Sequence, residues 1–253
     1  MNTTGNTILV TGGGSGIGRG LAEAFHRLGN QVIIAARGQK AVDETAAANP
    51  GMKALVFDIS SPASIDSFAA QLREEFPSLN ILINNAGIMR TENLSEKGVS
   101  AAEETITTNL LGPIRLTNAV LPLLQKQPRA AIVNVSSGLA FVPLAMTPTY
   151  CATKGALHSY TQSLRYQLRD TKVDVIELIP PYVQTTLMGE QQASDPNAMP
   201  LDEYIVEVME IFQTRPQATE ICVKKVQPLR FAAESGRENY EVFFEKFNDS
   251  MHK

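Results

Sequence analysis

The sequence predicts an α/β fold in which one parallel sheet is covered by helices on both faces. Short apolar runs alternate with helix-like stretches from one end of the chain to the other, as in a doubly wound sheet. The runs are apolar at successive positions, which is typical of parallel strands that are buried on both faces. We therefore expect one domain over residues 1–253, with a seven-stranded parallel sheet; 253 residues are enough for a sizeable core.

The first unit, residues 7–28, is predicted as a buried strand, a glycine-rich turn and a helix. The turn contains five glycines: Gly12, Gly13, Gly14, Gly16 and Gly18. Glycine has no Cβ, so the backbone can turn sharply and lie against a ligand. The helix that follows offers free N–H groups and the positive end of its dipole, which bind phosphate. This context predicts a dinucleotide pyrophosphate site; the alternative is an ordinary tight turn between strand and helix.

The next units repeat the order of strand and helix. A strand over 31–35 is followed by a helix over 39–48, which the asparagine, proline and glycine at 49–51 end. A strand over 53–57 leads to Ser61 and Pro62, the expected N-cap and first residue of a helix that runs to residue 76. A strand over 81–83 runs into the Asn-Asn-Ala-Gly sequence at 84–87.

A long helix is predicted to begin at Ser100, where Ser100 and Glu103 have the form of a capping box. It contains Asn109 and Pro113, and we expect a kink at Pro113 because proline removes an intrahelical hydrogen bond. A strand over 131–135 then ends at the Ser-Ser-Gly sequence 136–138, and a helix from residue 150 to 168 follows.

The last third of the chain begins with a strand over 173–179. Residues 184–200 are polar and irregular, and we interpret them as a mobile substrate lid. A helix over 201–212 and a short strand near 221–223 follow. The tail, 236–253, is predicted to be helical, with an aromatic stripe that we interpret as a core or subunit contact: Tyr240, Phe243, Phe244 and Phe247.

Composition excludes several classes of function. A hydrophobic fraction of 43% and a charged fraction of 19% fit a globular protein. A net charge of −4 without a basic block argues against nucleic-acid binding. We expect no targeting segment and no membrane span. The two cysteines, Cys151 and Cys222, form no disulfide framework, so we expect a cytoplasmic protein; three histidines without a Cys/His cluster predict no metal site.

Tyr150 and Lys154 carry the strongest chemical signal. They lie four residues apart on a predicted helix and so share one face, and Ser137 follows a parallel strand, where ligands bind in such folds. A tyrosine hydroxyl can protonate the alkoxide that forms when a carbonyl accepts a hydride, but its ordinary pKa of about 10 is high for this step. A lysine ammonium one turn away is expected to lower that pKa. Ser137 would polarise the carbonyl, with Ser136 as the alternative.

Four features together resemble the short-chain dehydrogenase/reductase superfamily: TGGGSGIG, NNAG, the helical asparagine, and a serine 13 residues before YxxxK. The motifs span residues 7–185, and the resemblance implies a Rossmann-like fold. It also implies a catalytic set in which Lys154 holds the nicotinamide ribose as well, and Asn109 supports a water that passes protons to Lys154: Asn109, Ser137, Tyr150 and Lys154. The implied cofactor-binding positions are Gly12, Gly14, Ser15, Gly16, Ile17, Gly18, Arg37, Asp58, Ile59, Asn85, Ala86, Gly87, Tyr150, Lys154, Pro180, Val183 and Thr185. The sequence departs from the family at Pro181, usually glycine, and at Asn80, often aspartate.

The end of the second strand favours NADP (NADPH) as the cofactor. An NAD enzyme places an acidic residue there to accept a hydrogen bond from the ribose 2′-OH, but this chain has Ala36. Arg37 follows, and a guanidinium suits a 2′-phosphate; a solvated surface charge is the alternative. The expected function is reversible NADPH-dependent reduction of a carbonyl. The alternatives are an NAD-dependent alcohol dehydrogenase and a regulator that senses the dinucleotide without turnover.

Apolar residues after the strand ends predict a pocket for an uncharged ketone or aldehyde. The expected pocket residues are Met89, Leu139, Leu144, Tyr182, Leu187 and Met188. We expect Arg90 to point outward, because the loop after it is polar. The resemblance also implies a homodimer or homotetramer, with the helices around Asn109 and Tyr150 at the subunit contact.

Overall fold

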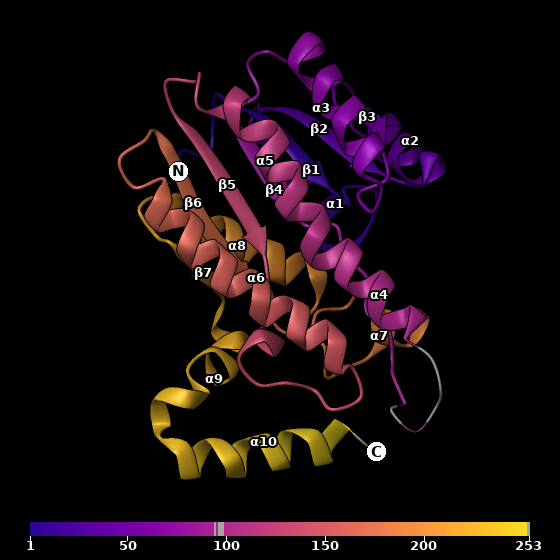
Figure 1. Cartoon of the computed structure of the whole chain (residues 1–253), viewed down its shortest axis with the longest axis vertical. Helices are drawn as coiled ribbons and strands as arrows, with labels where there is room; N and C mark the ends of the chain where they lie inside the picture. The colour runs from indigo at the N-terminus through magenta and orange to yellow at the C-terminus, as the bar shows by residue number, and fades with distance from the viewer. Residues whose placement is uncertain (94, 96–98, 252–253) are drawn as a thin grey trace.

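Seven parallel strands form one sheet in the described part of the chain, in the order β3-β2-β1-β4-β5-β6-β7 (Figure 1). The computed structural model describes residues 1–93, 95 and 99–251. The strands are β1 (Thr7–Thr11), β2 (Gln31–Ala36), β3 (Lys53–Val56), β4 (Ile81–Asn84), β5 (Ala130–Val135), β6 (Val173–Ile179) and β7 (Glu220–Cys222). The chain order reverses between β1 and β4, and ligands bind at such a switch point, beyond the carboxyl ends of the strands. The predicted fold class is confirmed.

Helices cover both faces of this sheet, as expected. They are α1 (Gly16–Arg27), α2 (Gln39–Ala48), α3 (Pro62–Glu75), α4 (Ser100–Ile106), α5 (Gly112–Leu124), α6 (Pro148–Gln167), α7 (Glu190–Ser194), α8 (Leu201–Thr214), α9 (Gln227–Arg230) and α10 (Arg237–Met251). Short 3₁₀ turns lie at η2 (Gly138–Ala140), η3 (Lys224–Val226) and η4 (Ala232–Ser235). In Figure 1, α5 and α6 lie on the near side of the sheet.

Two apolar cores lie against opposite faces of the sheet. Alternate residues of a strand point to opposite faces, so Ile8 and Val10 of β1 pack in the core that contains α1 and α8. Leu9 packs in the other core, with α3, α5 and α6. Burial on both faces explains why the strands read as continuous apolar runs in the sequence.

The long helix differs from its prediction at two points. Helix α4 begins at Ser100 with Val99 in the N-cap position, so Ser100 is not the cap and the predicted capping box is wrong. The irregularity expected at Pro113 occurs earlier, as the π-helical turn η1 (Thr107–Leu111) between α4 and α5. Pro113 has no N–H to donate to the carbonyl of Asn109, and the N–H of Gly112 reaches back to the carbonyl of Thr107. The wider turn thus contains Asn109.

The predicted lid and tail are both ordered where the structure describes them. Within 184–200, α7 and a bridge between Val183 and Met199 give the lid more structure than we expected. Helix α10 forms most of the tail, whose last residues, 252–253, lie outside the described residues. It lies apart from the sheet, at the end of the molecule where the chain ends (Figure 1). Two of its side chains, Tyr240 and Asn248, bond to the backbone of the loop after β5.

Candidate active site

The glycine-rich turn presents bare backbone to a cleft beside α1. Gly12 and Gly16 have φ of +68° and +51°, a conformation that side chains disfavour. A Cβ on Gly16 would lie 3.3 Å from the Thr185 methyl group and would narrow the space between the turn and Thr185. Ser15 is the N-cap of α1, and its side chain makes no capping bond. The first N–H groups of α1 therefore face this cleft with the positive end of the helix dipole.

Two of the predicted cofactor glycines have a packing role instead. A Cβ on Gly18 would lie 2.3 Å from the Gly12 carbonyl oxygen, so only glycine lets the helix pack against the turn. A Cβ on Gly14 would lie 3.0 Å from Ala41 of α2. Neither residue lines the cleft. Both shape the turn from behind, through contacts that the spacing of the glycines does not reveal.

The Asn-Ala-Gly sequence after β4 is fixed to the end of β1. The backbone N–H groups of Asn85 and Ala86 both donate to the Thr11 hydroxyl, at 3.0 Å each. The Asn85 amide donates to the Thr11 carbonyl at 2.9 Å. These bonds hold the ends of β1 and β4 together at the switch point, and Asn85, Ala86 and Gly87 line the cleft.

Asn109 connects the π-helical turn to the segment after β4. Its side-chain oxygen accepts from the Ile88 N–H, and its amide donates to the Ile88 carbonyl, both at 2.8 Å. It also lies 3.4 Å from the Thr153 hydroxyl of α6. Asn109 is buried and does not line the cleft itself. It sets the position of the backbone beside Tyr150 and Lys154.

Helix α6 places Tyr150 and Lys154 on the wall of the cleft, opposite the end of β5. Ser137 has an extended backbone and directly precedes η2. It hydrogen-bonds to the Tyr150 hydroxyl. Burial nevertheless raises the pKa of Tyr150 above its ordinary value, and the Ser137 hydrogen bond offsets only part of that rise. The predicted lowering of the Tyr150 pKa by Lys154 is therefore wrong for this state of the protein.

Lys154 is buried as well, beside the end of β5. Its Nζ donates to the Val135 carbonyl at 2.7 Å and lies 5.6 Å from the centroid of the Tyr150 ring. Burial disfavours the ammonium and lowers the pKa of Lys154 to about 8, while the negative charge of Glu177 acts in the opposite direction. At neutral pH, Tyr150 is thus a neutral phenol, and the lysine beside it readily loses its proton.

These elements enclose a cavity of about 320 Å³. Most of the expected catalytic and cofactor residues line it: Gly12, Ser15, Gly16, Ile17, Asn85, Ala86, Gly87, Ser137, Tyr150, Lys154, Pro180, Val183 and Thr185. The other expected positions do not: Gly14, Gly18, Arg37, Asp58, Ile59 and Asn109. Ser136, the alternative serine, also lines the cavity, but its hydroxyl is bonded to Glu177.

The family model of the short chain dehydrogenases matches residues 6–196, which include every element of this cavity. This chain belongs to the short-chain dehydrogenase family. It is 39% identical to the uncharacterised oxidoreductase DltE of Bacillus subtilis over 98% of either chain. It is 33% identical to an NADP-dependent 3-hydroxy acid dehydrogenase of Schizosaccharomyces pombe, over 88% of this chain and 93% of that protein.

Solved structures of other short-chain dehydrogenases have the same fold. One from Sphingobium yanoikuyae, in complex with NADPH, is 28% identical and matches with a TM-score of 0.78 over 98% of this chain and 95% of its own. A 3-ketoacyl-(acyl-carrier-protein) reductase from Brucella melitensis, complexed with NADH, is also 28% identical, with a TM-score of 0.76 over 86% and 94%. This chain is thus an oxidoreductase of a family that binds nicotinamide dinucleotides.

The expected substrate residues of this short-chain dehydrogenase lie mostly outside the cavity. Leu187 lines it, but the other five, Met89, Leu139, Leu144, Tyr182 and Met188, do not. Four of these five, all except Tyr182, pack with Tyr150 in an apolar cluster that Phe247 and Met251 of α10 also contact. Tyr182 donates to Asp195 at 3.1 Å. The apolar side chains fill the space behind Tyr150 themselves, because they pack on one another.

Arg90 lies at the edge of the cavity rather than fully outside it. Its side chain is 46% exposed and pairs with Glu104 at 3.6 Å, yet the residue is part of the lining. Arg90 comes directly after Ile88 and Met89 and so remains beside the site. A positive charge is therefore available at this edge of the cavity.

The lining residues that the sequence interpretation missed include Val135, Pro181, Thr186 and Gln192. Gln192 of α7 is buried and donates to the Val183 carbonyl at 2.8 Å and to the Thr185 hydroxyl at 3.1 Å. Its neighbours Glu190 and Gln191 are both exposed. Only the short helix, which the polar sequence does not reveal, decides which of these side chains faces inward.

Arg37 and Asp58 lie on the surface next to the glycine-rich turn. Arg37 is exposed just after β2. Its charge and the hydrogen bonds from Ser60 lower the pKa of Asp58. Ile59 is buried against Gly112, whose Cβ would lie 2.5 Å from an Ile59 side-chain carbon. Of these three expected positions, Arg37 alone presents an exposed positive charge.

Proposed function

We propose that this protein is an NADPH-dependent carbonyl reductase that also catalyses the reverse oxidation of an alcohol. The observation that carries the proposal is that Tyr150, Ser137 and Lys154 line one cavity with the glycine-rich turn. The bare backbone at Gly12 and Gly16 and the free start of α1 fit a pyrophosphate. A nicotinamide bound beyond that turn supplies or accepts the hydride.

In the reducing direction, Tyr150 is the proton donor. Because burial raises the pKa of its hydroxyl, the phenol keeps its proton at neutral pH and can give it to the carbonyl oxygen. Ser137, which is hydrogen-bonded to the same hydroxyl, would hold and polarise that oxygen. Lys154 follows one turn later on α6 and would bind the ribose and restore the proton of Tyr150. Asn109 keeps the π-helical turn and the Ile88 backbone in place beside them.

NADPH is the proposed cofactor because β2 ends in a neutral residue that a positive one follows. Ala36 leaves no carboxylate for a ribose 2′-OH, and the exposed guanidinium of Arg37 suits a 2′-phosphate. An NADP-dependent relative and an NADPH-bound neighbour support this choice, whereas another neighbour binds NADH. Replacing Ala36 with Asp and Arg37 with Ser should shift kcat/KM in favour of NADH. Equal kcat/KM for both cofactors in the unmodified protein would contradict the proposal.

Two substrate classes fit different parts of the site. Apolar side chains in the cavity lining, Ile88, Val183 and Leu187, favour an uncharged ketone or aldehyde. Arg90 at the edge of the cavity favours a carboxylate, as in a 3-hydroxy acid, the substrate class named for the relative from S. pombe. We place the apolar ketone first, because Arg90 is already paired with Glu104.

A matched pair of substrates separates the two classes. An aryl methyl ketone and a 3-keto acid of similar size are compared by kcat/KM with NADPH. We expect the ketone to be preferred. A tenfold preference for the acid, about 1.4 kcal/mol of transition-state binding, would reverse the order, and Arg90→Gln should then remove that preference while leaving the ketone unaffected.

The same assay tests whether the protein is instead a sensor of the dinucleotide. A sensor needs no proton donor, and the presence of Tyr150 and Ser137 in one cavity argues against it. Tight NADPH binding without turnover of any ketone, aldehyde or hydroxy acid in a broad panel would support the sensor. We further propose a cytoplasmic location, since both cysteines are free. None of the described helices is long and apolar enough to cross a membrane.

A further inference from the structure

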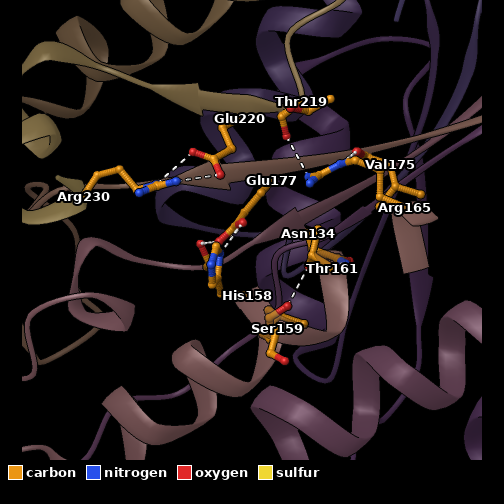
Figure 2. A network of polar contacts seen from close by, with 12 residues as sticks. Asn134, His158, Ser159, Thr161, Arg165, Val175, Glu177, Thr219, Glu220 and Arg230 are labelled. Atoms are coloured by element: carbon orange, nitrogen blue, oxygen red, sulfur yellow. Dashed lines mark hydrogen bonds and ion pairs between the residues drawn. The ribbon is translucent and has the colours of Figure 1, made fainter. Parts of the chain in front are cut away.

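Glu177 of β6 has a fully buried carboxylate to which the proposed reaction assigns no role. Its Oε1 accepts a hydrogen bond from the Ser136 hydroxyl at 2.5 Å, and its Oε2 lies 2.7 Å from Nδ1 of His158 (Figure 2). The Glu177 side chain is 0% exposed and that of His158 is 19% exposed. A carboxylate at this depth is costly unless donors hold it. Two donors from two different elements hold this one in a single position.

Both donors lie next to the residues proposed for the reaction. Ser136 stands between Val135, whose carbonyl accepts from Lys154, and Ser137. His158 follows Lys154 by four residues on α6 and therefore lies on the same helix face. The Glu177 carboxylate is thus hydrogen-bonded to two places near Lys154. One is the end of β5, where the Val135 carbonyl accepts from Lys154, and the other is the next turn of α6, the helix that carries Lys154. The buried ammonium and the buried carboxylate share one region of low dielectric constant.

The other charged groups near Glu177 already have hydrogen-bond partners. Glu220, which is opposite Glu177 in the register of β6 and β7, accepts from Arg230 at 2.8 and 3.0 Å. Arg165 donates to the carbonyls of Val175 and Thr219 (Figure 2). In the described part of the chain, the charge of Glu177 also acts on Lys154 of α6 and Cys222 of β7.

A metal ion is not needed to explain the cluster. Three ligand atoms, one each from His158, Glu177 and Glu220, lie within 4.8 Å of one another, so these residues could bind a cation. However, Arg230 occupies the Glu220 carboxylate, and Ser136 and His158 occupy that of Glu177. Hydrogen bonds and ion pairs between the side chains of the cluster therefore account for both carboxylates.

We propose that Glu177 is a positioning residue for the reaction: its buried negative charge, held by Ser136 and His158, keeps Lys154 protonated at neutral pH. The inference deepens the proposed function, on which it rests. Burial alone favours the neutral amine, and Glu177 is the charged group that raises the pKa of Lys154 against this effect, to about 8. Without that charge, the lysine would lose its proton below pH 8 and could not restore the proton of Tyr150.

The first test follows Lys154 directly and needs no substrate. The protein is labelled with [13Cε]lysine, and the Lys154 resonance is identified by its absence from Lys154→Arg. Its midpoint is then measured by NMR from pH 6 to pH 11. We expect Glu177→Gln, which keeps the shape of the side chain, to lower the midpoint by about one pH unit.

Two variants serve as controls. Glu220→Gln removes the neighbouring carboxylate, which Arg230 holds, and should leave the midpoint unchanged. Glu177→Asp keeps the charge and should retain most of the wild-type value. If Glu177→Gln does not fold alone, all variants are measured with saturating NADPH, because a ligand that binds the native state stabilises it.

The second test measures ketone reduction with NADPH as a function of pH. If the Lys154 midpoint falls from about 8 to about 7, the protonated fraction at pH 8 falls from one half to about one tenth. The kcat of Glu177→Gln at pH 8 should therefore fall roughly fivefold, with a much smaller loss at pH 6. A loss that is the same at every pH would indicate packing and overturn the inference.

The two tests distinguish failure of the role of Glu177 from failure of the proposed function. An unchanged Lys154 midpoint in Glu177→Gln, or an equal shift in Glu220→Gln, would overturn the role of Glu177. Absence of turnover in the wild-type protein would overturn the proposed reductase, yet the NMR midpoints would still decide whether Glu177 controls the lysine.

Discussion

Tyr150 and Lys154 show how burial changes two side chains in opposite directions. Removal from water disfavours whichever form is charged, so it raises the pKa of the tyrosine and lowers that of the lysine. Both changes favour the neutral form, yet with a pKa of about 8 Lys154 is still mostly protonated at neutral pH. The phenol is ready to donate a proton in carbonyl reduction. Oxidation of an alcohol needs the phenolate and should therefore require a higher pH.

The first prediction at this scale concerns the proton itself. Tyr150→Phe removes the hydroxyl and little else, so ketone reduction should fall at least about 100-fold, the low end of what general acid catalysis contributes. The NADPH dissociation constant, measured by fluorescence titration, should stay within about twofold of wild type. Activity above a hundredth of the wild-type rate would show that another group supplies the proton.

The second prediction concerns the pH dependence of stability. Lys154 has a pKa of about 8 in the folded protein and an ordinary value of 10.5, so the unfolded chain binds more protons between these two values. Stability relative to a Lys154→Met variant should therefore rise with pH from 8 to 10.5, by at most about 3 kcal/mol. Urea unfolding of both proteins at several pH values measures the difference. A difference that falls with pH would show that the lysine is not buried as an amine.

Helix α10 is joined to the rest of the fold through the loop after β5. Asn248 is its buried polar residue: its side-chain oxygen accepts from the Ala145 N–H at 2.6 Å, and its amide donates to the Pro143 carbonyl at 3.1 Å. Tyr240, two turns earlier, bonds to the Phe141 carbonyl. These bonds hold Phe247 and Met251 against the apolar cluster around Tyr150. The tail thus packs on the apolar cluster behind Tyr150, outside the cavity.

The prediction for this element is that Asn248→Ala loosens α10. Loss of two buried hydrogen bonds should lower the free energy of unfolding by about 1–3 kcal/mol, measured in urea. Asn239→Ala is the matched control, because Asn239 is exposed and bonds only within the helix end, to the Ser235 carbonyl. The control should change stability by less than about 0.5 kcal/mol. Equal losses in both variants would mean that the bonds to the β5 loop contribute nothing specific.

At the scale of the whole molecule, apolar side chains lie exposed along the helix that contains Asn109. Ile106, just before the π-helical turn, is 40% exposed, and Leu111, the last residue of that turn, is 36% exposed. On α6, Leu157 and Leu164 are buried in the sheet-facing side, while Ala152 is exposed. Two helices with an inner face in the core and apolar residues on the outer face fit the proposed subunit contact.

We therefore predict a homodimer or homotetramer in solution. Light scattering at micromolar concentration should give two or four times the mass of 27.5 kDa. The double variant Ile106→Glu and Leu111→Glu should lower that mass without loss of the far-UV circular dichroism signal. Exposed Val242 on α10 provides a control position, since Val242→Glu should leave the mass unchanged. A monomer for the unmodified protein would contradict the subunit contact.

Local patterns determined much of this protein in advance. The strands are mostly apolar on both faces because helices cover both sides of the sheet, so their number and type follow from the sequence. The glycine-rich turn, Ser137 and the Tyr150–Lys154 pair could be predicted because each depends on spacing along the chain: a helix repeats every 3.6 residues, and parallel strands end at one edge.

Only the tertiary structure decided what surrounds these residues. The buried Glu177, the inward Gln192 and the packing of α10 on the β5 loop depend on contacts between segments far apart in the chain. The Tyr150 pKa was misjudged for the same reason: proximity to Lys154 could be read from spacing, but the loss of water around both groups could not. Periodicity specifies which face a residue occupies, whereas burial, and with it charge, depends on everything that packs against that face.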